Sequence, residues 1–261
     1  MKRKIFPVLL CAILICMFFV IFCYEKQKNT IAVIGAMDEE IAEFFTSLKH
    51  PKTTKSNNFT IITGTLGNNN IVLTKSGVGK VASAATTQFI IDKYRPKYII
   101  NTGIAGSLSN DLNAGSIILA NRMVQHDFDV TAFGNPKGYI DNGIEPDKPT
   151  IFHSDRTLID KFKKELEAQD NTKVIIGTIA TGDIFVNKKE QKIQIKKEFS
   201  ADATDMESAA IAQTAQINNV PLLVIRTISD SENNSVSEYK RNKETSATKA
   251  AFAIISVLGN K

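Results

Sequence analysis

The chain has 261 residues, enough for one large domain or two small ones with a sizeable core, and a formal net charge of +5. The charge excess is local, because the first 29 residues hold five basic residues against one acid, and the remainder holds 27 basic and 26 acidic residues. Nucleic-acid binding needs clustered cations, with aromatic side chains where the target is single-stranded. Neither is evident in the nearly neutral remainder, so no nucleic-acid partner is expected.

An uncharged apolar run of 19 residues, 5–23, follows a basic block at residues 2–4. As a helix this run would extend about 28 Å, close to the hydrocarbon thickness of a bilayer. A signal peptide has a shorter apolar centre and small residues before its cleavage site, and no such site is visible. We therefore predict a signal or transmembrane anchor over residues 1–24 and a linker over residues 25–29, with a cleaved signal as the alternative. The positive-inside rule then predicts a membrane-anchored or exported protein, with its body on the non-cytoplasmic side.

Beyond residue 29, short apolar runs typical of strands alternate with longer runs typical of helices. This alternation predicts one α/β domain with a mixed sheet and helices on its faces. The helix over 187–199 is rich in lysine and is expected at the surface. We expect strands over 30–35, 59–65, 71–75, 97–102, 116–120, 123–130, 173–180 and 221–227, and helices that begin at Asp38 and Ser208 or cover 79–94, 155–169, 187–199 and 237–258.

Cysteine and histidine usage argues against metal and thiol chemistry in the body of the chain. All three cysteines lie in the apolar N-terminal segment, so the body has no disulfide, no thiolate nucleophile and no cysteine metal site. His50, His126 and His153 are scattered without the spacing of a metal site. We therefore predict no metal ligands.

Carboxylates stand at the edges of two apolar elements, which is an unusual place for a charge. Asp205 and Glu207 flank Met206 at the start of a predicted helix of small residues, and Asp230 stands where the strand over 221–227 should end. Ligands of α/β sheets bind at the carboxyl ends of the strands. Two carboxylates with different surroundings can divide proton donation and sugar binding between them. These residues therefore predict a site at the sheet edge.

Three further segments carry residues whose role the pattern leaves open. The segment 35–40 places three acids in a first helical turn, where the helix dipole favours each by about 0.3–1 kcal/mol but does not choose among them. The segment 181–186 follows a strand, and Phe185 there could pack in the core or stack on a flat ring. The segment 126–134 is either a surface loop with a hydrophobic anchor or part of a site.

Seven short motifs occur in one order along the chain, and together they are specific. In that order the chain resembles the 5′-methylthioadenosine/S-adenosylhomocysteine nucleosidases of the nucleoside phosphorylase superfamily, over essentially residues 31–261. The resemblance implies a phosphorylase-like three-layer αβα sandwich with a central mixed sheet, and a nucleosidase domain over residues 30–261. The motifs are Ile34-Gly-Ala-Met-Asp-Glu-Glu40, Lys75-Ser-Gly-Val-Gly-Lys80, Asn101-Thr-Gly103, Asp129-Val-Thr-Ala-Phe133, Thr181-Gly-Asp-Ile-Phe185, Met206-Glu207 and Ser229-Asp230.

The resemblance implies a hydrolase that cleaves the N9–C1′ bond of adenine thionucleosides and releases adenine and a thioribose sugar. By position, Glu40 matches the base that activates water, Asp230 the acid that protonates adenine N7, and Glu207 the residue that binds the ribose hydroxyls. No metal or organic cofactor is implied. The other implied substrate-binding residues are Met206 against the sugar, Phe185 stacked on adenine, the backbone of Val186 at the adenine edge, Ser76 and Ser229 as polar supports, and Met37.

The resemblance also implies a homodimer, because Val130 and Phe133 match a loop that reaches into the pocket of the neighbouring subunit. Asp205 departs from the family, which usually has the longer glutamate there, and Ile104 and Ser107 depart from a turn that is commonly more polar or has glycine. Two alternatives remain: a nucleoside phosphorylase of the same fold, or an exported binding or adhesion protein that has lost catalysis.

Overall fold

The computed structural model describes residues 29–141, 148–169, 174–231 and 236–259. The predicted anchor, residues 1–24, lies outside them. Ten strands form one sheet, and six helices and a short 3-10 helix, η1, accompany it in the described part of the chain. The strands are β1 (Thr30–Gly35), β2 (Lys49–Ser56), β3 (Phe59–Leu66), β4 (Asn69–Lys75), β5 (Tyr98–Ser107), β6 (Ile117–Gln125), β7 (Phe152–His153), β8 (Val174–Thr181), β9 (Ala203–Asp205) and β10 (Leu222–Asp230). The helices are α2 (Asp38–Ser47), α3 (Lys80–Tyr94), η1 (Thr131–Phe133), α4 (Arg156–Glu167), α5 (Lys189–Phe199), α6 (Ser208–Ile217) and α7 (Val236–Gly259).

The sheet is mixed and closes on itself at one end. Its strand order is β10-β6-β8-β9-β5-β1-β4-β3-β2, and β10 also pairs with β5. Five strands, β5, β10, β6, β8 and β9, therefore form a closed ring, from which β1, β4, β3 and β2 continue as an open sheet. Within the ring the β5–β10, β6–β8 and β8–β9 pairs are parallel, and the other two pairs are antiparallel.

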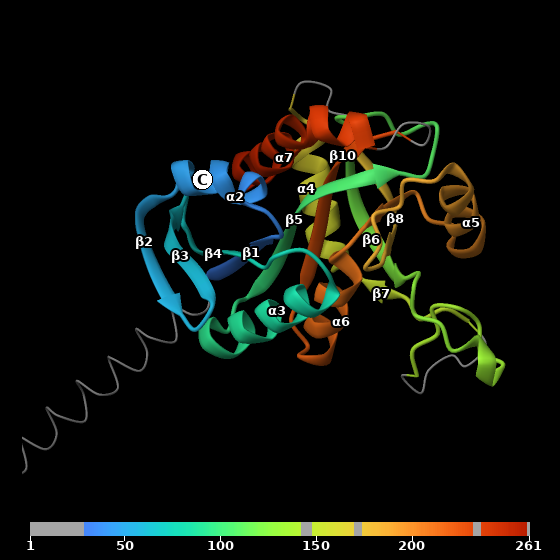
Figure 1. Cartoon of the computed structure of the whole chain (residues 1–261). Helices are drawn as coiled ribbons and strands as arrows, with labels where there is room; N and C mark the ends of the chain where they lie inside the picture. Colours follow the sequence, from blue (N-terminus) through green and yellow to red (C-terminus); the bar gives the residue numbers. More distant parts are fainter. Residues whose placement is uncertain (1–28, 142–147, 170–173, 232–235, 260–261) are drawn as a thin grey trace, which may run out of the picture.

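Helices cover both faces of the sheet, which confirms the predicted three-layer α/β class (Figure 1). One core joins the sheet to α2, α4 and α7, through side chains such as Phe44, Phe162 and Ile254. A second core joins the other face to α3 and α6, through Ile90 and the small residues of α6. A third, smaller cluster packs α5 against the ring. The small side chains on α6 let this helix lie close to the sheet.

The main differences from the predicted elements lie at polar strands. The predicted strands over 116–120 and 123–130 are one strand, β6, whose register shifts between Ala120 and Arg122 and which ends at Gln125. The strand β2 was not predicted, because its residues are polar and almost all exposed. It forms the outer edge of the sheet, where lysines and a proline are common since they discourage pairing with another chain.

Candidate active site

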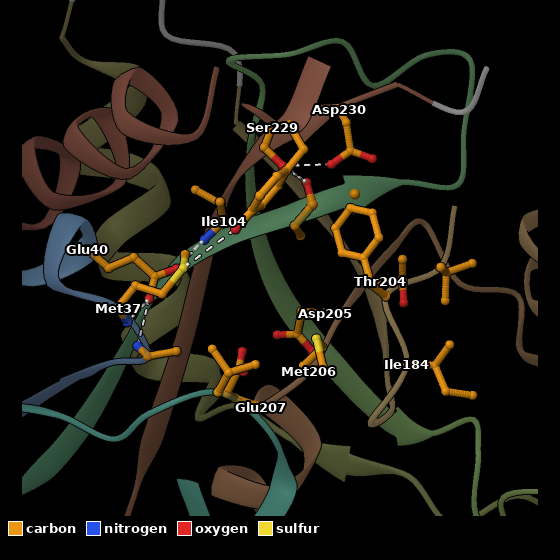
Figure 2. A pocket seen from close by; sticks show the side chains of 17 residues that line it. Met37, Glu40, Ile104, Ile184, Thr204, Asp205, Met206, Glu207, Ser229 and Asp230 are labelled. Carbon is orange, nitrogen blue, oxygen red and sulfur yellow. Dashed lines mark hydrogen bonds between the residues drawn. The ribbon is translucent and has the colours of Figure 1, made fainter. Parts of the chain in front are cut away.

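A pocket of about 590 Å³, part of it open to solvent, lies at the carboxyl ends of β1, β8, β9 and β10. Figure 2 shows Glu40, Glu207 and Asp230 on different sides of it. The seventeen lining residues are Ala36, Met37, Glu40, Val78, Ile104, Ala105, Gly106, Ile184, Phe185, Val186, Thr204, Asp205, Met206, Glu207, Ser229, Asp230 and Tyr239.

Glu40 is the one of the three acids of the first turn of α2 that faces the pocket. Asp38 pairs with Lys75 at the surface, and Glu39 pairs with Lys243 of α7. The carboxylate of Glu40 instead turns inward, where Oε2 accepts from the backbone N–H of Ala36 at 2.6 Å and of Met37 at 3.1 Å, and Oε1 accepts from Ile104 N–H at 3.1 Å. These contacts join α2 to the middle of β5.

Burial and charge act in opposite directions on Glu40. Its side chain is buried, which raises the pKa of the carboxyl above its ordinary value, and the guanidinium of Arg226 and the three N–H donors oppose that rise. Hydrogen bonds to the charged form favour ionisation. The surroundings of Glu40 therefore suit a buried carboxylate that can accept a proton.

Glu207 stands between β9 and the start of α6. Its Oε1 accepts from Gly79 N–H at 3.0 Å, just before α3 begins. Burial, with the neighbouring carboxylate of Asp205, raises the pKa of Glu207 to about 8, against the opposing charge of Arg226. A carboxyl with so few partners of its own is ready to accept hydrogen bonds from a ligand.

Asp230 is the last residue of β10. Its Oδ1 accepts from the hydroxyl of Ser229 at 2.7 Å, and its Oδ2 lies 3.3 Å from the Nζ of Lys192. Burial raises the pKa of Asp230, and the contacts with Ser229 and Lys192 oppose that rise. Ser229 therefore lies where the sequence predicts a residue that orients Asp230.

Beneath the pocket, Arg226 and Asp205 form a buried ion pair. Arg226 is 1% exposed, and its Nη2 lies 2.9 Å from Asp205 Oδ2 and donates to Asn101 Oδ1 at 2.7 Å. The other carboxylate oxygen, Asp205 Oδ1, accepts from Thr181 Oγ1 at 2.6 Å, and the hydroxyl of Ser208 also donates to Asp205. The shorter acid at position 205 is therefore held by residues of β8, α6 and β10.

Aromatic and apolar side chains close the pocket. The rings of Phe185 and Tyr239 meet edge to face with their centroids 5.2 Å apart, and the Tyr239 hydroxyl lies 3.6 Å from the sulfur of Met37. Val186 is buried beside Phe185, and Met206 lies between Asp205 and Glu207. An apolar floor with a partly exposed ring can hold a flat heterocycle.

Eight of the eleven predicted site residues line the pocket: Met37, Glu40, Phe185, Val186, Met206, Glu207, Ser229 and Asp230. Ser76, Val130 and Phe133 do not. The hydroxyl of Ser76 donates to the backbone oxygen of Gly77 at 2.8 Å, at the same sheet edge. Val130 directly precedes η1 and Phe133 is its last residue, on a segment that projects from the body (Figure 1), and Phe133 is 84% exposed.

Three residues at or beside the site were missed by the sequence prediction. Arg226 was visible as a charge inside the apolar run of β10, which is a signal of a buried ion pair. Lys192 shares a helix face with Ile195 and Phe199, three and seven residues further on, and that spacing marks a buried face. Tyr239 follows the undescribed residues 232–235, and nothing in the pattern of α7 singles it out.

Carboxylates around a half-apolar pocket at the strand ends of a mixed α/β sheet define the class of an acid–base enzyme that acts on a small molecule. The family model "Phosphorylase superfamily" matches residues 30–258, and the chain belongs to that superfamily.

Its relatives are nucleosidases and related hydrolases. A 5′-methylthioadenosine/S-adenosylhomocysteine nucleosidase of Maridesulfovibrio salexigens is 35% identical over 87% of this chain and 98% of its own. The crystal structure of the Neisseria meningitidis nucleosidase with methylthio-immucillin-A is 34% identical, with a TM-score of 0.83 over 89% of this chain and 100% of the other. A futalosine hydrolase of Helicobacter pylori is 30% identical, with a TM-score of 0.82 over 89% and 98%. The predicted family resemblance is confirmed.

The predicted localisation is wrong. The relatives are nucleosidases that are matched over 98% and 100% of their own length by 87% of this chain. No helix in the described part of the chain is long and apolar enough to cross a membrane. The anchor predicted over residues 1–24 itself lies outside the described residues, as does nearly all of the linker.

Proposed function

We propose that residues 30–261 form a nucleosidase that hydrolyses the N-glycosidic bond of 5′-methylthioadenosine and S-adenosylhomocysteine. The products are adenine and the thioribose sugar. The observation that carries this proposal is the placement of Glu40, Glu207 and Asp230 around one pocket, each with different partners. The nucleosidase relatives and the complex of one of them with methylthio-immucillin-A support the same substrates.

Asp230 is the proposed general acid. Adenine is a poor leaving group until N7 is protonated, so the acid must hold its proton near neutral pH. Burial of Asp230 raises its pKa in that direction. Ser229 fixes the orientation of the carboxyl through its hydrogen bond to Oδ1.

Glu40 is the proposed base. As the C1′–N9 bond breaks, the sugar becomes positively charged, and a nearby carboxylate stabilises that charge. The three backbone N–H donors keep Glu40 in place and favour its ionised form. A water between Glu40 and C1′ can then lose a proton to Glu40 while its oxygen bonds to C1′.

The remaining lining residues are proposed to hold the substrate. Glu207 accepts hydrogen bonds from the ribose hydroxyls, and Met206 packs against the sugar. Phe185 stacks on adenine, with Val186 at the adenine edge and Met37 on the opposite side of the pocket. Ser76 is proposed as a polar support at the strand end beside the pocket.

Hydrolysis is favoured over phosphorolysis by the charges near Glu40. No lysine or arginine is among the described residues that line the pocket, and the buried Arg226 is engaged by Asp205 and Asn101. A phosphate ion would therefore meet the Glu40 carboxylate without a free cation to hold it.

The test supplies methylthioadenosine with and without phosphate and analyses the sugar product. We expect adenine and free thioribose at the same rate in both, and loss of activity by about 10²–10⁴-fold in Asp230→Asn. Sugar 1-phosphate as the product would overturn the hydrolase proposal. Futalosine is included as a competing substrate, because a futalosine hydrolase shares the fold and 30% of the sequence. Faster turnover of futalosine would reassign the substrate.

We also propose a homodimer in which η1 of one subunit reaches the pocket of the other. The proposal rests on the family resemblance, in which Val130 and Phe133 match a loop that reaches the neighbouring subunit, and Phe133 is 84% exposed and so accessible to a partner chain. Molar mass in solution tests this proposal. We expect a dimer for the natural protein and a shift toward monomer for Phe133→Ser, whereas a monomeric natural protein would contradict it.

A further inference from the structure

Lys192 is a lysine that the structure buries completely. It lies on α5, whose other lysines are exposed, and its side chain has 0% exposure. The packing of Ile195 and Phe199 into the core turns this face of the helix inward. Burying an ammonium group costs free energy unless the charge is paired.

The partner of Lys192 is the proposed general acid. Its Nζ lies 3.3 Å from Asp230 Oδ2 and donates to the backbone oxygen of Ser231 at 2.7 Å. The other oxygen, Oδ1, accepts from Ser229. Both oxygens of Asp230 are thus held by donors, one of which carries a full positive charge.

Other charged and titratable groups near Asp230 come from α7. Glu238 accepts from Ser231 N–H at 2.6 Å, and its charge raises the pKa of Asp230. Tyr239 lines the same pocket, and burial raises the pKa of its hydroxyl. Burial and Glu238 both raise the pKa of Asp230, and the ammonium of Lys192 opposes that rise.

We propose that Lys192 is a positioning residue for the proton transfer: its ammonium holds Asp230 and stabilises the carboxylate that forms when Asp230 protonates the leaving adenine. This inference rests on the proposed function. In the step, the O–H bond of Asp230 breaks and N7–H forms, while the electron pair of the C1′–N9 bond moves into adenine. Water gives its hydroxyl to C1′ and a proton to Glu40, and before the next turnover Glu40 releases that proton to solvent while Asp230 regains one.

The charge of Lys192 has two opposite effects on this step. It stabilises the product carboxylate, which favours the transfer, because fixed charges stabilise charge that develops in a transition state. It also lowers the pKa of Asp230, so the acid loses its proton at a lower pH than it otherwise would. Activity needs protonated Asp230, and the upper limb of the pH profile of kcat/KM therefore falls at the pKa that Lys192 helps to set.

The experiment measures kcat/KM against pH for Lys192→Met and Lys192→Gln. Glutamine keeps a donor for Ser231 without the charge. We expect the upper limb to move to higher pH, by about one to three units, the usual effect of a nearby opposite charge. We also expect kcat to fall, and Lys192→Arg to restore the natural profile. Lys196→Met, exposed on the same helix, is the matched control and leaves both unchanged.

An unchanged pH profile in folded Lys192→Met and Lys192→Gln, with only a lower Tm, would overturn the inference and leave Lys192 as a tether between α5 and β10. If Lys192→Met does not fold, Lys192→Gln and Lys192→Arg decide the question alone. Absence of adenine release from the natural protein would instead contradict the proposed function, so the two failures are distinguishable.

Discussion

Glu207 illustrates how a site residue can oppose the stability of its own fold. Burial raises its pKa from an ordinary 4.5 to about 8. Between these values the folded protein keeps a proton that the unfolded chain releases. The free energy of unfolding contributed by this group is therefore highest at low pH and is lost as the pH rises through that window.

We expect Glu207→Gln to raise the Tm of the ligand-free protein, and to raise it more at about pH 8 than at about pH 5. The amide cannot ionise, so the variant does not lose stability as the pH rises. Each kcal/mol of unfolding free energy recovered raises the Tm by about 2–4 °C. Activity falls, because an amide accepts ribose hydroxyls less strongly than a carboxylate. Thermal unfolding across pH measures the difference, with the exposed Glu198→Gln as control. A Tm gain that is independent of pH would contradict the assignment.

Asp205 is the departure from the family pattern that the structure accommodates. Its carboxylate pairs with the buried Arg226 and accepts from Thr181 and Ser208. Although aspartate is one methylene shorter than glutamate, its carboxylate still reaches these three partners. The shorter acid therefore keeps this buried network intact beside Glu207.

We expect Asp205→Asn to lower the free energy of unfolding by about 3–5 kcal/mol, because it leaves the guanidinium of Arg226 buried without a counter-charge. Denaturant unfolding measures this cost. Asp38→Asn removes an exposed partner of Lys75 and should cost at most about 1 kcal/mol. Equal costs for the two variants would refute a structural role for the buried pair.

At the scale of elements, β5 comes close to α2 through Gly103. A Cβ at this position would lie 2.6 Å from Glu40 Oε1 and 3.1 Å from Arg226 Nη1. The absence of a side chain therefore lets the strand pass directly beneath the proposed base.

We expect Gly103→Ala to lower kcat by roughly 10²-fold, since a displacement of about 1 Å in a catalytic group has an effect of that order. Steady-state kinetics with methylthioadenosine provide the measurement. Gly259→Ala, where the nearest atom to a new Cβ is 3.9 Å away, is the matched control. If Gly103→Ala has the same kcat as the natural protein, Glu40 can shift without slowing the reaction.

The apolar strands and the helices of the fold could be predicted from the sequence, including the lysine-rich α5, whereas the polar or very short strands could not. β1, β10 and α6 follow from runs of buried residues, and the carboxylates at their ends marked the site. β2 and β9 escaped prediction because one is polar and exposed and the other is three residues long. The burial of Lys192 and Arg226 was not predicted, because a buried cation is identified by the carboxylate that pairs with it. These carboxylates, Asp230 and Asp205, are distant in sequence.

For the whole molecule, the proposed dimer makes each pocket depend on two chains. Phe133 would serve the neighbour's pocket, whereas Asp230 serves its own. A Phe133→Ser chain thus keeps Asp230 in its own pocket but cannot supply Phe133 to the pocket of its partner. An Asp230→Asn chain supplies Phe133 to its partner but lacks the acid in its own pocket.

We expect a mixture of these two inactive variants, unfolded and refolded together, to recover up to about a quarter of natural activity. Random pairing makes half of the dimers mixed, and each mixed dimer has one complete pocket; the weaker dimerisation of Phe133→Ser lowers that share. Adenine release after mixing gives the measurement. Each variant refolded alone is the control, and no recovery in demonstrably mixed dimers would exclude a shared pocket.

The closed ring of strands bears on the order in which the protein matures. β5 must pair with β10, whose residues follow it by more than a hundred positions, so the ring cannot close until nearly the whole chain has left the ribosome. Such distant pairings fold slowly. An interrupted chain that contains Glu40 on α2 but ends before β10 lacks Asp230 and would therefore be inert. Catalysis therefore begins only once β10 has been synthesised and has paired with β5.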